Sequence, residues 1–132
     1  MLPENPLRFT FSRRERLHIQ SDFSEILNHG RKLSSPALFI FINNRKALGE
    51  GAGASLLPPS RMGLVTSRKV GNAPKRNQAK RRLREIFRLH KHMLKPGTDC
   101  IFIPRAPITG MTYQNLKSLV LENLRKASVI VE

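Results

Sequence analysis

The sequence predicts an α+β domain in which helices pack against one β-sheet. Two observations indicate this fold: capped amphipathic helices alternate with short apolar strands, and their order is helix, strand, strand, helix, strand, helix. A length of 132 residues and a hydrophobic fraction of 39% suffice for one core and not for two. We therefore expect residues 1–132 to form a single domain.

An arm and a short helix are expected at the N-terminus. Residues 1–12 are expected to be a partly ordered arm. In it, Phe9 and Phe11 can either stack on bases or pin the arm to the core as a short strand, and their alternate spacing favours pinning. Ser21 can cap a helix that ends at His29-Gly30. The apolar face of that helix, with spacing i, i+3, i+4, comprises Phe23, Ile26 and Leu27.

Three apolar segments have the length and composition of β-strands. The first spans Ala37–Ile42, the second centres on Leu64–Thr66, and the third spans Asp99–Arg105. The unbroken apolar run of the first strand indicates that both its faces are at least partly covered. Residues 43–60, rich in glycine and proline, are expected to form a flexible loop. The pattern leaves room for one additional short strand.

Two further helices are predicted. The central helix begins at the N-cap Asn72, with Pro74 in its first turn, and Lys95–Gly97 are expected to end it. The last helix is capped by Thr112 and carries a core-facing apolar stripe. At about 100° per residue, one side of the central helix is apolar and an adjacent side is basic. The stripe of the last helix comprises Leu116, Leu119, Val120, Leu124 and Ala127, and that of the central helix Ala79, Leu83, Ile86, Phe87, His90 and Met93. The basic arc comprises Arg76, Asn77, Lys80, Arg81, Arg84, Arg88 and Lys91.

The basic arc is unfavourable for an isolated helix. Ser67–Leu94 holds ten of the 24 basic residues of the chain and one acid, Glu85. Like charges four residues apart, such as Lys80 and Arg84, destabilise a helix by roughly 0.2–0.5 kcal/mol per pair. A solvated charged face is the simpler interpretation of a charge run. We favour a polyanionic ligand, because it explains why the repulsion is tolerated.

The amino-acid composition also indicates a polyanionic partner. A formal net charge of +15 attracts phosphates and makes a nucleic acid the first partner to consider. The single Cys100 lies in an apolar run and is expected to be a core residue in a reducing compartment. No apolar segment approaches the length of about 20 residues that crosses a bilayer, and no signal peptide is recognisable. We therefore expect a cytoplasmic protein with no membrane partner.

The residues that enzymes use for catalysis are not arranged for it here. The nine acids are scattered, with no pair spaced as a dyad or a metal site. His90 and His92 would point about 200° apart on a helix and cannot chelate one ion together. There is no Walker-type phosphate loop and no dinucleotide fingerprint. The sequence therefore indicates a binding protein, with no catalytic residue and no protein metal ligand.

The central stretch closely resembles the signature of the protein subunit of bacterial ribonuclease P. The resemblance is carried by Ser67–Ala73, Lys75–Asn77, Lys80-Arg81 and Leu83–Arg88. Stretches around Glu15–Phe23, Gly30–Pro36 and Pro96–Leu116 agree in order and spacing, so the likeness covers roughly Phe9 to Lys126. It implies a mixed four-stranded sheet of the ribosomal protein S5 domain 2-like type, with a left-handed βαβ crossover.

The resemblance also implies an activity. Ribonuclease P is a ribonucleoprotein endonuclease that removes the 5′ leader from precursor transfer RNA, and its RNA subunit performs the hydrolysis with bound Mg²⁺. The protein subunit binds this RNA and the leader, and holds no cofactor itself. By position, the residues implied to contact the catalytic RNA are Arg68, Lys69, Arg76, Asn77, Lys80, Arg81 and Arg84.

A cleft between the first helix and the sheet holds the single-stranded leader in that family. Phe23 and Phe41 could supply base stacking, worth about 1–3 kcal/mol per base. An aromatic residue is common in the family where this chain has Leu27. The alternative for all three residues is ordinary core packing. By position, the leader-binding residues are Phe23, Leu27, Phe41, Val65 and Ser67.

The chain departs from the family pattern in two places. The usual Arg-Asn-Arg motif is Arg76-Asn77-Gln78 here, and because Gln78 faces away from the basic arc, RNA affinity should fall only modestly. The loop 43–60 is longer than is common. Two other functions fit a small basic α+β protein. One is a ribosomal or assembly protein that binds ribosomal RNA, and the other is a DNA-binding regulator with a helix in the major groove.

Overall fold

The structure is a computed structural model that describes residues 11–44 and 59–130. Most of the predicted arm (residues 1–10) and most of the predicted loop (residues 45–58) lie outside the described residues. Seven helices and strands are described in order: α1 Gln20–His29, β1 Arg31–Ser34, β2 Leu38–Asn44, β3 Arg61–Leu64, α2 Ala73–His90, β4 Thr98–Pro104 and α3 Tyr113–Lys126. Short 3₁₀ turns span Arg13–Glu15, Arg68–Val70, Lys91–Met93 and Ala106–Gly110.

The four strands form one mixed sheet in the order β1-β2-β4-β3. β2 is antiparallel to β1 and β4, whereas β3 is parallel to β4, so the chain crosses over through α2 between two parallel neighbours. This confirms the predicted mixed four-stranded α+β fold, and β1 is the additional short strand. β3–α2–β4 is the βαβ unit for which the family resemblance predicts a left-handed crossover.

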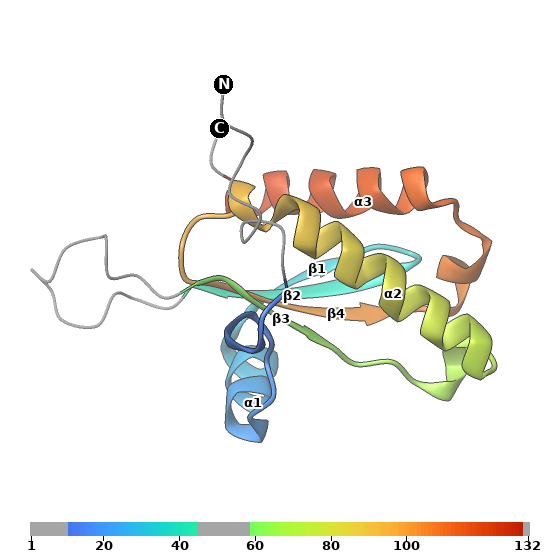
Figure 1. The fold of residues 1–132 in the computed structure, drawn as a ribbon, viewed down its shortest axis with the longest axis horizontal. Coiled ribbons are helices and arrows are strands. Elements are labelled where there is room, and N and C mark those ends of the chain that lie inside the picture. The colour runs from blue at the N-terminus through green and yellow to red at the C-terminus, as the bar shows by residue number, and fades with distance from the viewer. Residues whose placement is uncertain (1–10, 45–58, 131–132) are drawn as a thin grey trace, which may run out of the picture.

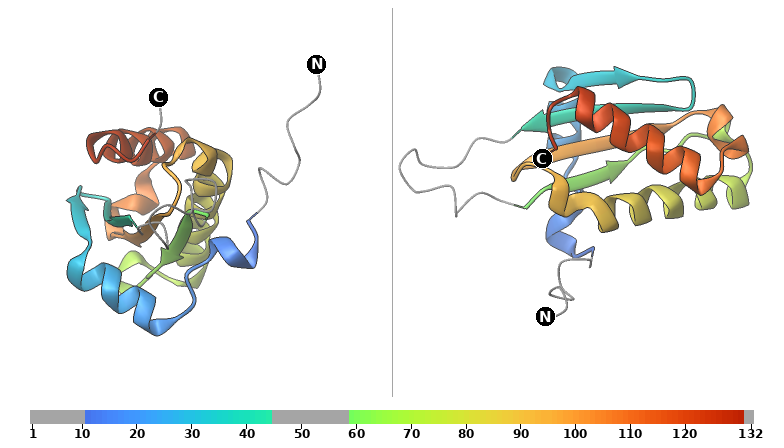
Figure 2. Two further views of the ribbon diagram at one scale, coloured as in Figure 1. Left: turned by 90° about the vertical axis from the view of Figure 1, so that its left-hand side faces the viewer. Right: turned by 90° about the horizontal axis from the view of Figure 1, so that it is seen from above.

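The helices lie on both sides of the sheet. α2 and α3 cover one face, and α1 lies under one end of the other face (Figures 1 and 2). The larger core lies between the sheet and α2 with α3, and the predicted apolar stripes of both helices face it. A smaller cluster on the α1 side consists of Leu17, Ile26 and Ile101, against which Phe23, Phe41 and Ile103 pack.

Local signals correctly predicted two helix starts. The side-chain oxygen of Asn72 accepts a hydrogen bond from the amide of Lys75 at 3.1 Å, and the hydroxyl of Thr112 accepts one from the amide of Asn115 at 3.1 Å. Cys100 is fully buried, and burial raises the pKa of its thiol to about 12. It is therefore a core residue, as predicted.

Within the described residues, no helix has the length and apolar character needed to span a membrane.

Four predicted boundaries are wrong by two residues or more, whereas the start of β2 and both ends of β4 are shifted by one residue. α1 starts earlier, with Ile19 at its N-cap and Ser21 inside the first turn, because the Ile19 carbonyl already accepts from the Asp22 amide. β2 extends through Asn44, because its last two residues still pair with β4, so the loop starts later than residue 43. The other two errors concern β3 and the end of α2.

β3 ends before the centre that the sequence predicts for it. Only Arg61–Leu64 pairs as a strand, although the Val65 amide still donates to the Phe102 carbonyl at 3.1 Å. The chain then enters the turn Arg68–Val70, which ends at Gly71 with φ +147°, a value that favours glycine. α2 ends at His90, five residues before the predicted stop, because the next residues tighten into the turn Lys91–Met93 that leads toward β4.

Candidate nucleic-acid interface

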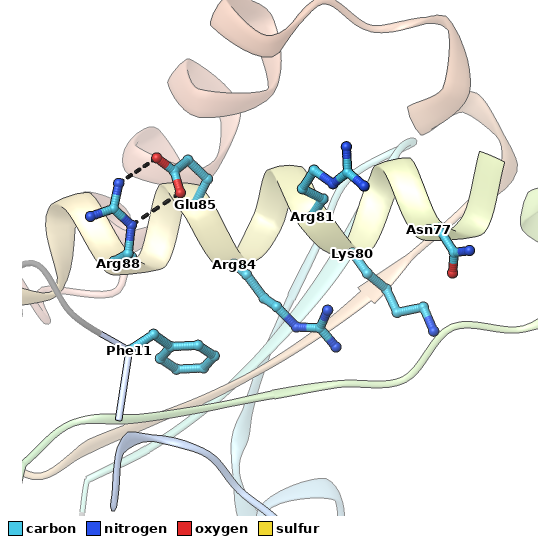
Figure 3. Close-up of a pocket in the computed structure, with 7 residues that line it drawn as sticks. All are labelled: Phe11, Asn77, Lys80, Arg81, Arg84, Glu85 and Arg88. Atoms are coloured by element: carbon cyan, nitrogen blue, oxygen red, sulfur yellow. Dashed lines mark hydrogen bonds and ion pairs between the residues drawn. The ribbon is translucent and has the colours of Figure 1, made fainter. Parts of the chain in front are cut away.

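The basic arc lies along the side of α2 that its apolar stripe leaves free. Ala79, Leu83, Ile86 and Phe87 are buried, which fixes the rotation of the helix. Arg81 and Arg84 are consequently exposed. In Figure 3, Asn77, Lys80 and Arg84 extend to one side of the helix and Arg81 extends to the other side of it in this view, but all four line one hollow. The structure therefore gathers these four predicted RNA-contact residues on one surface.

A hollow of about 380 Å³ lies against this surface, and we call it the arc hollow. Among the described residues that line it, Phe11 is the one aromatic residue (Figure 3). The Phe11 ring packs edge-on against Phe87, with 5.7 Å between the ring centroids, and the Arg16 guanidinium lies 4.7 Å from the Phe11 centroid. Phe11 is therefore pinned to the core, as predicted, but by ring packing and not by strand pairing. The lining residues are Phe11, Asn77, Lys80, Arg81, Arg84, Glu85 and Arg88.

Ion pairs divide the basic arc into two groups. Arg88 pairs with Glu85, and this hydrogen bond lowers the pKa of the Glu85 carboxyl. Lys91 pairs with Glu15, whose pKa is lowered because the hydrogen bonds from Lys91 and Ser12 outweigh the opposing effect of burial. Apart from Arg76, which bonds a backbone carbonyl and is described below, the remaining arc cations are Lys80, Arg81 and Arg84, and they have no carboxylate partner in the described part of the chain. These three cations are available to an anionic ligand.

The other predicted RNA-contact residues lie at the start of α2. Arg76 is half-buried, and its guanidinium donates to the Gly71 carbonyl at 3.3 Å. Arg68 and Lys69 are exposed in the turn that precedes α2, where the Ser67 hydroxyl accepts from the Lys69 amide at 3.3 Å. The N-terminal end of α2 therefore adds three cations to the same basic segment.

A second hollow, of about 160 Å³, lies around the edge strand β3, and we call it the α1 hollow. Phe11 and Arg84 line both hollows, so the two adjoin. The Phe23 ring can pack against β3 only because residue 63 is a glycine: a Cβ there would lie 2.7 Å from two atoms of the ring. The lining residues are Phe11, Arg16, Leu17, Phe23, Met62, Gly63, Leu64 and Arg84.

The predicted leader-binding residues are only partly brought together. Phe23 lines the α1 hollow, and Phe41 packs in the same cluster as Phe23 around Ile101. Val65 is 39% exposed just beyond the end of β3, and Leu27 is 36% exposed on α1. Ser67 is exposed further along the chain. The structure thus places Phe23 and Phe41 together, whereas Leu27, Val65 and Ser67 stand at separate points around them.

An ion-pair network that the sequence did not suggest holds α1 on the sheet. Arg61, at the start of β3, donates two hydrogen bonds to Asp99 at 3.0 and 2.8 Å, and one to Asp22 on α1 at 3.0 Å. The Asp99 side chain is 1% exposed, and that of Arg61 is 18% exposed. The hydrogen bond to Asp99 is the main cause that raises the pKa of the Arg61 guanidinium. Arg61 therefore fixes the position of α1 beside the α1 hollow.

Other contributing residues were also missed by sequence reasoning. Arg16 and Gly63 line the α1 hollow. Arg16 lies in the Glu15–Phe23 stretch that resembles the family, but no contact was predicted for it, and no local pattern marks Gly63. Phe11 had a signal, its alternate spacing with Phe9, but this indicated only that the arm is pinned. Among residues 11–44 and 59–130, no group of three or more His, Cys, Asp or Glu side chains could hold a metal ion.

The fold and site define a class of protein: a small, strongly basic α+β protein with a surface suited to nucleic acid. The ribonuclease P family model matches residues 11–128. The ribonuclease P protein component of Petrotoga mobilis is 30% identical over 122 residues, which cover 89% of this chain and 94% of that protein. The Thermotoga maritima component is 36% identical over 100 residues, covering 76% and 77%. This chain belongs to the ribonuclease P protein family, and its role is that of the protein subunit of this endoribonuclease.

Solved structures agree with this assignment. The ribonuclease P protein of Staphylococcus aureus superposes with a TM-score of 0.73 at 28% identity, covering 89% of this chain and 98% of that chain. The Thermotoga maritima protein superposes with a TM-score of 0.68 at 30% identity, covering 86% and 97%. The family assignment excludes the DNA-binding regulator and the ribosomal protein as the main role of the chain.

Proposed function

We propose that this protein assists the catalytic RNA by binding two partners at once. The basic arc, with Arg68 and Lys69, binds the RNA subunit, and the α1 hollow with the adjoining sheet face binds the 5′ leader of precursor transfer RNA. One observation carries the proposal: Phe11 and Arg84 line both hollows, so the cationic surface continues into the aromatic one. An RNA bound along this path meets phosphate-binding and base-stacking groups in succession.

The basic arc acts through charge. Lys80, Arg81 and Arg84 line one hollow and have no carboxylate partners in the described residues, so their charges can face phosphates where catalytic RNA and substrate meet. Neutralising phosphates there releases bound counterions and favours the assembled complex. Magnesium belongs to the RNA subunit and the substrate in this proposal. We expect the protein to lower the magnesium concentration that the RNA needs, in the bacterial cytoplasm where transfer RNA is processed.

Leader binding accounts for substrate preference. Mature transfer RNA lacks the leader, so contacts made only to the leader favour substrate over product. Phe23 and Phe41 offer stacking surfaces, which accept any base because every base has a π face. We therefore expect preference for a leader to depend on shape and stacking more than on base identity.

Replacing Phe23 by alanine is expected to reduce the affinity of the holoenzyme for precursor transfer RNA by about 5- to 150-fold. This range corresponds to one lost base–aromatic stack of about 1–3 kcal/mol. Affinity for mature transfer RNA should not change. The measurement is equilibrium binding of both RNAs to holoenzyme assembled with each protein.

Phe23 is half-buried, so the substitution also removes packing. The matched control is Ile26→Val on the same helix, which removes buried volume at a residue that is 1% exposed and does not line the α1 hollow. Equal losses for precursor and mature transfer RNA with Phe23→Ala would show that Phe23 is a core residue without a leader contact.

A further inference from the structure

The turn Arg13–Glu15 near the N-terminus is attached to α2 by an ion pair that is nearly buried. The Glu15 carboxylate pairs with Lys91, the residue directly after α2, and their side chains are only 13% and 9% exposed. The Ser12 amide and hydroxyl donate to the other carboxylate oxygen of Glu15 at 2.8 and 3.0 Å. One oxygen of Glu15 thus closes the turn, and the other holds the turn against the end of α2.

The chain is also held on both sides of the turn. Before the turn, Phe11 packs edge-on against Phe87 of α2. After it, the Leu17 amide donates to the Met62 carbonyl on the edge strand β3 at 2.9 Å. Figure 1 shows the turn, in blue, beside β3. The segment from Phe11 to Leu17 therefore bridges α2 and β3.

The Glu15–Lys91 pair is better suited to positioning than to stabilising the fold. Taking two charges out of water is costly, and an apolar pair of similar size is often at least as stable. An ion pair of this kind differs from an apolar contact in that each charge must meet its partner, which defines the position of the turn. The two residues whose position it defines are Arg13 and Arg14.

Arg13 and Arg14 are exposed cations. Neither has a carboxylate partner in the parts of the chain that the structure describes. Neither lines the arc hollow or the α1 hollow, although Phe11 before them lines both and Arg16 after them lines the second. The two charges therefore lie on the outer surface, next to both hollows.

The turn extends the basic arc. On α2, the arc cations without a carboxylate partner end at Arg84, because the next two, Arg88 and Lys91, are paired. Lys91 is paired with an acid of the turn itself, so docking of the turn neutralises one arc cation and adds Arg13 and Arg14. The turn offers charge without an aromatic side chain, which suits the phosphate backbone of a folded RNA and provides no surface for base stacking.

We propose that Arg13 and Arg14 bind backbone phosphates of the RNA subunit, and that Glu15 and Lys91 are positioning residues that hold them at the end of the basic arc. This inference rests on the proposed binding of the RNA subunit by the basic arc and extends that interface to the N-terminal turn. A folded RNA that lies along α2 meets the turn next.

The phosphate contacts are tested with the double variant Arg13→Gln/Arg14→Gln. Binding of the full-length protein to the RNA subunit alone is measured over a range of salt concentrations. The slope of log affinity against log salt should fall by about two units, one for each phosphate contact. The matched control is Arg125→Gln/Lys126→Gln, which removes two adjacent exposed cations at the end of α3 and should leave the slope unchanged.

The positioning role is tested with Glu15→Ala. This variant removes an acid and raises the net charge by one, so general electrostatic attraction would strengthen RNA binding. We expect weaker binding and a smaller salt slope, because Arg13 and Arg14 are still present but no longer held. Adding Arg13→Gln/Arg14→Gln to Glu15→Ala should lower the slope less than it does in the wild type.

Two controls accompany Glu15→Ala. Glu122→Ala removes an exposed acid that pairs with Lys126 on α3, so it makes the same change in charge and should not weaken RNA binding. Glu15→Gln keeps the size of the side chain and removes its charge, and it provides the same test if Glu15→Ala does not fold. Urea denaturation checks that each variant is folded under the binding conditions.

Each part of the proposal can be overturned separately. An unchanged slope for Arg13→Gln/Arg14→Gln, or a loss seen only when holoenzyme binds precursor transfer RNA, would exclude contact of the turn with the RNA subunit. Unchanged or tighter RNA binding by a folded Glu15 variant would exclude the positioning role. Failure of the proposed function is distinguishable, because removing the arc cations Arg81 and Arg84 would then also leave the slope unchanged.

Discussion

Arg61→Ala is expected to lower the free energy of unfolding by about 3–5 kcal/mol, the cost of removing one partner from a buried ion pair. Asp99 is 1% exposed and would lose two hydrogen bonds and its Arg61 counter-charge, while Asp22 on α1 would lose one hydrogen bond. A typical domain has only about 5–15 kcal/mol of stability in total. The loss should therefore be visible as a large shift in the midpoint of urea denaturation.

The control for this experiment is Lys126→Ala. Lys126 pairs with Glu122 on α3, but both side chains are more than 60% exposed. An exposed pair contributes about 0–1 kcal/mol, so this variant should unfold near the wild-type midpoint. A loss below about 1 kcal/mol for Arg61→Ala would show that the Arg61–Asp99 pair is compensated in the variant and does not hold α1 on the sheet.

A second large effect is expected at the basic arc. The double variant Arg81→Ala/Arg84→Ala should bind the RNA subunit more weakly, and its slope of log affinity against log salt should fall by about two units, one for each phosphate contact. Both side chains are exposed and lack a carboxylate partner in the described residues, so their charges are available to RNA. Hydrogen bonds to charged groups contribute about 1.5–3 kcal/mol, so each lost contact should weaken binding by at least about tenfold.

Two comparisons make this prediction specific. Lys126→Ala removes the same kind of charge from the exposed side of α3 and should leave the salt slope unchanged. Arg88→Ala should have a smaller effect than Arg81→Ala or Arg84→Ala, because Arg88 is already paired with Glu85. A double variant with weaker binding but an unchanged slope would contradict direct phosphate contact by Arg81 and Arg84.

The parts of the fold that the sequence predicted well depend on local interactions. Asn72 and Thr112 cap their helices through contacts three residues away, and the apolar stripes of α2 and α3 follow from helical periodicity. The predicted basic arc is correct for the same reason, because burial of Leu83 and Phe87 fixes which side of α2 remains free. Helix caps and helical faces can therefore be predicted from the spacing of residues that are close together in the sequence.

The features that were missed depend on contacts between distant residues. Arg61 and Asp99 are 38 positions apart, and nothing near either residue in the chain indicates the pair. Phe11 meets Phe87 only after the N-terminal segment has folded against α2, and Gly63 becomes informative only when the Phe23 ring is seen against it. The extent of β3 is set by its pairing with β4, which is why a local pattern placed it too late.

The most direct test of the central claim is cleavage of precursor transfer RNA by a bacterial ribonuclease P RNA at low magnesium, with and without this protein. We expect the protein to restore cleavage where the RNA alone is inactive, and to do so more strongly for a substrate with a long leader than for one with a minimal leader. Tight binding of the RNA subunit without restored cleavage, or restoration that is independent of the leader, would contradict the account.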